Sequence, residues 1–83
     1  MSKKIQIERT QLGVRMEKRL AKVLKATAEY YDMSLGDLLE GFVLHAFEGK
    51  SPFDAAAQER IKRLMFIYEI DYDANDSHQL TEE

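Results

Sequence analysis

The sequence predicts a mostly helical fold with one short β-strand, and three observations lead to this prediction. Apolar and polar residues alternate from Gln11 to Met16, which is typical of a strand with one buried face. Apolar residues then recur every three or four positions over residues 17–31 and 35–47, the period of amphipathic helices. A third such segment spans residues 52–70. We therefore expect one strand, two helices and an extra C-terminal helix, in that order.

The expected strand has no second strand in its own chain with which to pair. Its apolar face would consist of Leu12, Val14 and Met16, and its polar face of Gln11, Gly13 and Arg15. An unpaired, half-apolar strand promotes aggregation, and pairing with the same strand of a second copy removes that exposure. We therefore expect a homodimer with a two-stranded ribbon, whose polar face suits the major groove of double-stranded DNA.

The length and composition of the chain fit this expectation. Eighty-three residues make one small domain with a marginal core, and dimerisation is a usual remedy. The chain has no cysteine, which excludes disulfides and suits a reducing cytoplasm. No apolar run is long enough to span a membrane, and residues 1–10 are too polar for a signal peptide. We expect a cytoplasmic protein without a membrane partner.

The net charge of -3 is unevenly distributed along the chain. Residues 1–25 hold eight basic and two acidic residues, whereas residues 26–83 hold four basic and thirteen acidic ones. The basic part would attract DNA phosphates through counterion release, and acidic groups held away from the duplex oppose this only weakly. The alternative is that these charges are ordinary solvated faces. Predicted phosphate contacts are Lys3, Lys4, Arg9, Lys18, Arg19 and Lys22.

These patterns divide the chain into four segments. Residues 1–9 form a flexible basic arm, residues 10–49 a strand–helix–helix core, and residues 50–70 a third helix. Residues 71–83 are acidic and poor in apolar residues, so we expect them to be disordered.

Capping signals locate the starts of the second and third helices. Ser34 followed by Asp37 resembles a capping box, and Gly49 is a typical C-terminal stop. Ser51 before Pro52 is an N-cap residue followed by proline at the first helical position. We therefore expect these two helices to begin at residues 35 and 52.

The alternating residues from Leu12 to Met16, the apolar stripe of the first helix and Met33-Ser34-Leu35 together resemble the ribbon-helix-helix family of transcriptional repressors. The resemblance covers residues 10–48 and implies a homodimer with an intermolecular antiparallel ribbon. The core of that dimer would consist of Leu12, Val14, Met16, Leu20, Leu24, Leu38, Leu39, Phe42 and Val43.

By position in the family motif, the residues that contact bases are Gln11, Gly13 and Arg15. Arginine pairs with guanine through two hydrogen bonds, and glutamine pairs with adenine in the same way. Gly13 departs from the family pattern because it has no side chain with which to read a base. Either the backbone approaches DNA closely at Gly13, or this protein reads fewer bases than its relatives.

The family also binds a phosphate at the start of the second helix, where backbone N–H groups are exposed. Ser34, Leu35 and Gly36 occupy that position here. Asp37 lies in the same turn and would repel a phosphate. Simple capping of the helix by Ser34 and Asp37 therefore remains an alternative interpretation.

A second functional class is a protein-interaction module, such as an antitoxin-like or scaffolding dimer. It would engage a partner protein through the acidic residues 52–83, and the net acidity and Gly13 favour it. The apolar face of the third helix favours packing on the protein's own dimer over wrapping a partner.

Enzymatic, cofactor and metal chemistry find little support in the sequence. Residues 71–82 have the acidic spacing of a calcium-binding EF-hand loop, but Asp76 replaces the usual glycine and no exiting helix follows. His45 and His78 have no second histidine at ligand spacing, and no histidine–nucleophile pair or glycine-rich phosphate loop is present. We expect no catalytic residues, no cofactor and no metal site.

Overall fold

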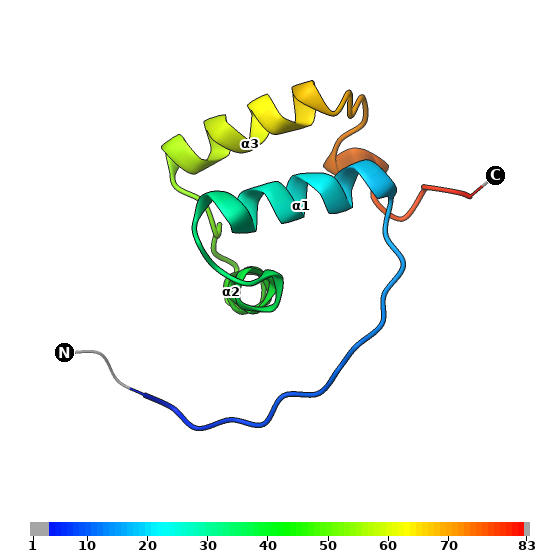
Figure 1. Cartoon of the computed structure of the whole chain (residues 1–83). Coiled ribbons are helices and arrows are strands. Elements are labelled where there is room, and N and C mark those ends of the chain that lie inside the picture. The colour runs from blue at the N-terminus through cyan, green and yellow to red at the C-terminus, as the bar shows by residue number, and fades with distance from the viewer. Residues whose placement is uncertain (1–3, 83) are drawn as a thin grey trace.

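A computed structural model of the protein describes residues 4–82. Its elements are α1 (Lys18–Tyr30), α2 (Leu35–Phe47), α3 (Ala55–Ile67) and the short 3₁₀ helix η1 (Ala74–Asp76). Helices α1 and α3 lie side by side and run in opposite directions, while α2 crosses beneath α1 (Figure 1). Helix α1 is therefore the central element and packs against both of the others.

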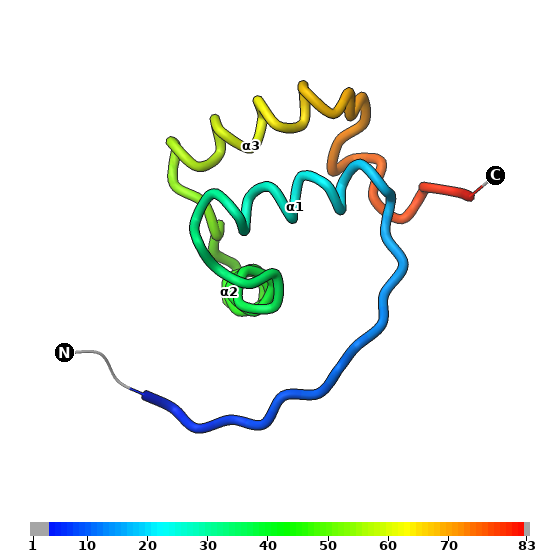
Figure 2. Tube along the Cα trace, in the orientation of Figure 1, coloured from blue at the N-terminus to red at the C-terminus, as the bar shows by residue number. Residues whose placement is uncertain are grey.

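The predicted strand and the two-stranded ribbon are wrong: the described residues contain three α-helices and one 3₁₀ helix, but no strand. The protein has a small all-helical fold, not a ribbon-helix-helix fold. Residues 4–16, here called the N-terminal segment, run as an extended trace away from the helices (Figure 2). The alternation of apolar residues indicates two faces, but a strand also needs ladder hydrogen bonds. No other described segment of this chain supplies them.

The second helix begins and ends where the sequence predicts, whereas the third begins later. Ser34 caps α2, since its Oγ accepts a hydrogen bond of 3.1 Å from the backbone N–H of Asp37. Asp54, rather than Ser51, caps α3, and its carboxylate accepts a hydrogen bond of 2.8 Å from Ala57 N–H. The Ser51 hydroxyl instead closes a local turn by accepting from Phe53 N–H at 3.3 Å.

The core lies around the inner face of α1 and is small. The buried residues are Val23, Thr27, Ala28, Leu38 and Ala57. The Thr27 hydroxyl donates a hydrogen bond of 2.7 Å to the Val23 carbonyl, so its polar group is satisfied inside the core.

The structure divides the predicted dimer core into two groups. Leu38 is buried within the single chain, and the half-buried members are Leu20, Leu24, Leu39 and Phe42. The exposed members are Leu12, Val14, Met16 and Val43. The structure therefore uses the first group in its own fold, and the second group stays exposed in the described chain.

The sequence predicts disorder after residue 70, but residues 71–82, here called the tail, turn back toward the start of α1 (Figure 1). Helix η1 lies within the tail and is closed by a capping box between Asp73 and Asp76. Among residues 4–82, no helix is both long and apolar enough to cross a membrane.

Candidate nucleic-acid interface

Three lysines share one exposed face of α1. Lys18, Lys22 and Lys25 are spaced four and three residues apart, so they are neighbours on the helix surface. The opposite side of α1 buries Val23 and Thr27 in the core. None of the salt bridges among the described residues involves these lysines. They form a continuous line of positive charge, here called the lysine stripe.

The lysine stripe has aromatic and acidic neighbours. The Lys22 ammonium lies 6.0 Å from the centre of the Tyr68 ring, within the range of a cation–π interaction. Glu29 follows Lys25 on the same helical face and is exposed. The positive surface is therefore concentrated on the first two turns of α1.

The N-terminal segment is tied to α2 by one ion pair. The Arg9 guanidinium donates two hydrogen bonds of 3.0 Å to the Glu40 carboxylate. These hydrogen bonds outweigh partial desolvation and hold the pKa of Glu40 below its usual value. The Arg9 side chain is 67% exposed and that of Glu40 is 42% exposed, and ion pairs so open to water contribute little to stability. Arg9 therefore positions the N-terminal segment only loosely.

The Glu17 carboxylate accepts three hydrogen bonds at the start of α1. It accepts from the backbone N–H of Arg19, from Arg19 Nε at 2.9 Å and from the Tyr72 hydroxyl at 2.9 Å. Burial acts to raise the pKa of Glu17, but these hydrogen bonds outweigh it and leave the pKa below its ordinary value. Burial, followed by the hydrogen bond to Glu17, raises the pKa of Tyr72. Glu17 thus joins α1 to the tail.

The residues predicted to contact bases lie on the N-terminal segment. Gln11 and Gly13 are exposed there, and no atom lies within 4 Å of the position that a Cβ on Gly13 would take. Arg15 is exposed and forms an ion pair with Glu82, since its Nη2 lies 2.9 Å from both carboxylate oxygens of Glu82. Packing within the described chain therefore gives no reason for glycine at position 13.

The predicted phosphate contacts do not form one site. Lys4 is exposed in the N-terminal segment, and Lys3 lies outside the described residues. The second predicted site, comprising Ser34, Leu35 and Gly36, lies beyond the C-terminal end of α1, whereas the lysine stripe starts at its N-terminal end. A helix of this length places Lys18 about 20 Å from the end of α1 that precedes this second site.

The start of α2 is capped by its own residues. Asp37 N–H is already bonded to Ser34, and Leu35 is half-buried. Gly36 and Asp37 are exposed. Capping by Ser34 is thus present in the structure, and phosphate binding at this position stays a prediction.

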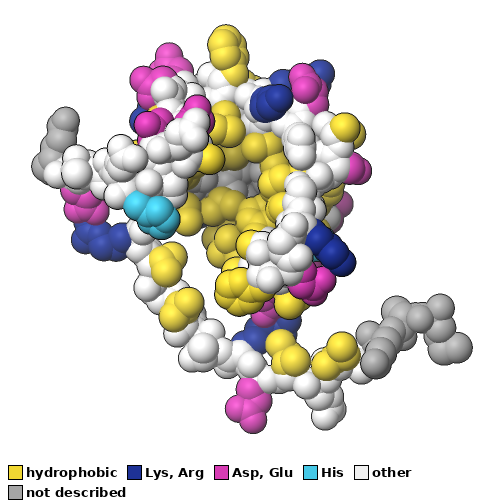
Figure 3. All heavy atoms as spheres, turned by 180° about the vertical axis from the view of Figure 1, so that it is seen from behind, with side chains coloured by type: hydrophobic (Ala, Val, Ile, Leu, Met, Phe, Trp, Pro, Cys, Tyr) yellow, Lys and Arg dark blue, Asp and Glu magenta, His cyan; other side chains and the backbone are white. Residues whose placement is uncertain are grey.

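A large apolar surface is exposed on α2. Val43, Leu44 and Phe47 are exposed on this helix, and the side chain of Phe47 is 84% exposed. Leu12, on the N-terminal segment, is 81% exposed. Viewed from behind, hydrophobic side chains gather in a hollow that the N-terminal segment borders (Figure 3). Among the described helices, only α1 packs against α2, so much of the apolar side of α2 stays exposed.

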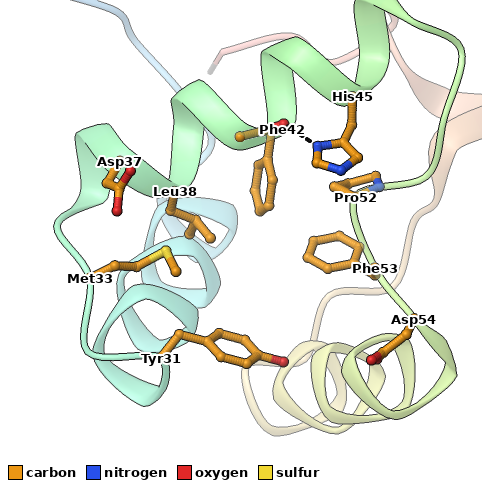
Figure 4. Close-up of a pocket in the computed structure, with 10 residues that line it drawn as sticks. Tyr31, Met33, Asp37, Leu38, Phe42, His45, Pro52, Phe53 and Asp54 are labelled. Carbon is orange, nitrogen blue, oxygen red and sulfur yellow. Dashed lines mark hydrogen bonds between the residues drawn. The ribbon is translucent and has the colours of Figure 1, made fainter. Parts of the chain in front are cut away.

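An open pocket of about 380 Å³ lies between the end of α1, helix α2 and the loop before α3 (Figure 4). Its apolar wall includes Leu38, Phe42 and Phe53, and the two phenylalanine rings meet edge to face at 5.0 Å. His45 lies at the rim, where its Nδ1 is 2.7 Å from the Gly41 carbonyl oxygen. Asp37 also lines the pocket. This arrangement contains no nucleophile beside His45.

A cluster of Arg60 with two tyrosines joins α3 to the end of α1, and sequence reasoning missed it. The guanidinium carbon of Arg60 lies 4.0 Å from the centre of the Tyr30 ring, and Arg60 Nη1 donates to the Tyr31 hydroxyl at 2.8 Å. Adjacent tyrosines at the end of a helix were the only signal in the sequence. Nothing indicated that an arginine 29 residues further on would reach them.

No family model, curated protein or solved structure matches this chain. The protein is therefore described by its own geometry: a small three-helix protein with an exposed, extended N-terminal segment. Among the described residues, no group of three or more histidine, aspartate or glutamate side chains is placed to hold a metal ion.

Proposed function

We propose that the protein is a homodimeric, sequence-specific DNA-binding protein that acts as a transcriptional repressor. The observation that carries this proposal is the lysine stripe, with Lys18, Lys22 and Lys25 on one exposed face of α1. A row of lysines outside any salt bridge of the described chain can exchange its counterions for phosphates. That exchange supplies affinity for any duplex sequence.

The N-terminal segment supplies the sequence preference in this proposal. A single extended chain is thin enough to enter a groove of the duplex, and Gln11 and Arg15 are exposed along it. Arg15 lies three residues before the start of α1, the helix that carries the lysine stripe. Phosphate contacts by α1 would therefore hold Arg15 close to the base edges.

The exposed apolar residues support self-association. Leu12, Val14 and Phe47 are strongly exposed, and the core of the single chain is small. Exposed apolar surface of this kind marks an interaction site, and a chain of this size gains much of its buried area by pairing. A second copy of the chain is the proposed cover. A symmetric dimer would recognise a two-fold related DNA site.

The proposal is tested by salt-titrated binding to random duplex DNA. Changing Lys18, Lys22 and Lys25 together to glutamine should weaken binding and flatten the dependence of log affinity on log salt. The slope should fall by about one unit for each lysine that contacts a phosphate. The matched control is Lys62→Gln, which neutralises an exposed lysine on α3 and should leave the slope unchanged. An unaltered slope in the triple variant contradicts the proposal.

A protein-interaction module is the second candidate, favoured by the exposed end of α3. Phe66 is 83% exposed and Ile67 is exposed beside it, so α3 presents apolar surface to solvent. Such a surface suits a partner protein. A chain that self-associates but binds no duplex DNA at low salt would favour this candidate over the repressor.

A further inference from the structure

The acidic tail and the turn just before it contact residues 15–19, at the start of α1, in three places. The Tyr72 hydroxyl donates to Glu17 at 2.9 Å, in a partly buried position. Arg19 Nη1 donates to the Glu69 carbonyl at 2.6 Å, just before the tail begins. Near the end of the tail, Glu82 accepts hydrogen bonds from Arg15. The tail is therefore held beside the N-terminal end of α1 (Figure 1).

The charges of the two surfaces are complementary. Residues 15–25 carry five basic residues and one acidic residue. Residues 71–82 carry four acidic residues and no lysine or arginine. Arg19 also lies 4.0 Å from the Asp71 carboxylate, and its guanidinium carbon is 5.8 Å from the centre of the Tyr72 ring. Within the described chain, the tail thus supplies most of the negative charge that faces this basic end.

Carboxylate and phosphate oxygens bind a guanidinium in the same way. Both accept two parallel hydrogen bonds from the planar guanidinium, so one arginine cannot pair fully with both at once. The Glu82 carboxylate takes this position on Arg15, with one oxygen 3.2 Å from Nε and the other 2.9 Å from Nη2. A DNA phosphate or base edge that reached Arg15 would have to displace Glu82.

We propose that the tail is an autoinhibitory segment, which competes with DNA for Arg15 and the basic start of α1. This inference rests on the proposed DNA-binding function and adds a means of regulating it. The Tyr72–Glu17 hydrogen bond anchors the segment. The Glu82 carboxylate pairs with Arg15, the arginine proposed to contact DNA. Release of the tail would free Arg15 to contact DNA together with the already exposed lysine stripe.

The competition is moderate in strength. The Arg15 and Glu82 side chains are 85% and 75% exposed, and water screens such a pair strongly. Loss of the pair should therefore raise DNA affinity by about two- to fivefold at low salt, the range that one exposed ion pair allows. Added salt should reduce this gain, because it screens the pair as well as the DNA contacts.

The test compares full-length variants for binding to random duplex DNA at low salt. Glu82→Gln removes the carboxylate that pairs with Arg15, and Tyr72→Phe removes the anchoring hydroxyl without changing the charge. Glu59→Gln changes the net charge by the same amount as Glu82→Gln, at an exposed position on α3. We expect the first two variants to bind more tightly than the parent chain and Glu59→Gln to bind as the parent does.

A second measurement follows the tail directly. Nuclear Overhauser contacts between the Tyr72 ring and the Arg19 side chain should be present in the parent chain and lost when duplex DNA is added. If all variants bind DNA as tightly as the parent, or if Glu59→Gln gains as much as Glu82→Gln, the inference is overturned while DNA binding stands. Contacts that persist in the DNA complex also overturn it. If no variant binds DNA at low salt, the proposed function fails and the inference with it.

Discussion

At the residue scale, Arg15 is the side chain to which the proposed function assigns the sequence preference. It lies where the N-terminal segment meets α1, and its Glu82 partner is too exposed to bind it firmly. The alternation within residues 11–16, a local pattern, predicted Arg15 on the polar face of a strand, which the structure does not contain. The pairing of Arg15 with Glu82, 67 residues away in the chain, has no local signature.

Changing Arg15 to alanine should selectively weaken binding to a preferred DNA site. The loss should be about 1–3 kcal/mol, the usual contribution of a bidentate arginine–base contact, with a smaller effect on random duplex. Selection of a preferred sequence from a random pool, followed by competition binding, measures the difference. Arg63→Ala on α3 is the control. Equal losses on both kinds of DNA would assign Arg15 to phosphate contact instead.

Glu17 makes attachment of the tail dependent on pH. Its pKa lies below the ordinary value of 4.5, because hydrogen bonds from Arg19 and Tyr72 outweigh the opposing effect of burial. A lowered pKa in the folded state means that the ionised carboxylate stabilises the fold above pH 4.5, and that this stabilisation is lost as pH falls through the lowered pKa.

We therefore expect the tail to detach from α1 on acidification below pH 4.5. The Tyr72 ring resonances, followed in an acid titration, should report the change with the pKa of Glu17. In Glu17→Gln this transition should be absent, while other carboxylates continue to titrate. A Tyr72 transition that survives in Glu17→Gln would show that another group controls the attachment.

At the scale of the elements, the helices follow from local patterns and their contacts do not. Helix α2 has the predicted bounds because its apolar period and its Ser34 cap act within a few residues. Ser51 and Asp54 lie close together, and either residue type can cap a helix. Helix α3 begins later than predicted because Asp54 is the cap and Ser51 closes the turn before it. Phe53 packs edge to face on Phe42 of α2, and the chain turns there before the helix starts. Long-range packing thus selected the second cap.

This assignment of caps predicts unequal effects on stability. Asp54→Ala should lower the free energy of unfolding by about 1 kcal/mol, because the backbone N–H of Ala57 loses its acceptor. Ser51→Ala should lower it less, since the hydroxyl closes only an exposed turn. Urea unfolding followed by circular dichroism compares the two. A larger loss for Ser51→Ala would mean that α3 begins at Pro52.

At the scale of the whole molecule, the distribution of apolar surface is the main feature. Four hydrophobic residues are buried, two of them alanines, while Phe47 and Leu12 face solvent. Helices α2 and α3 both pack on α1, which leaves the outer face of α2 uncovered within the described chain. The proposed homodimer would cover that face, and α3 stays on its own chain.

Phe47→Asp should therefore shift the protein from dimer to monomer at micromolar concentrations. A charge at the centre of an apolar contact loses its hydration and finds no partner there. Phe66→Asp is a closely matched control, because Phe66 on α3 is as exposed as Phe47. Sedimentation equilibrium measures the oligomeric state. A parent chain that is monomeric at these concentrations, or a dimer that Phe47→Asp leaves intact, contradicts the proposed self-association.

The sequence by itself determined the central helices, because helical periodicity and the Ser34 cap depend on residues within a turn or two. It also determined where positive charge is concentrated. Only the tertiary structure decided that residues 11–16 form no strand, because ladder hydrogen bonds need a second segment that the described chain does not supply. It likewise decided that the tail lies against α1, since Tyr72 and Glu82 find their partners 55 and 67 residues away. Such distant pairings depend on how the helices pack and leave no periodic trace in the sequence.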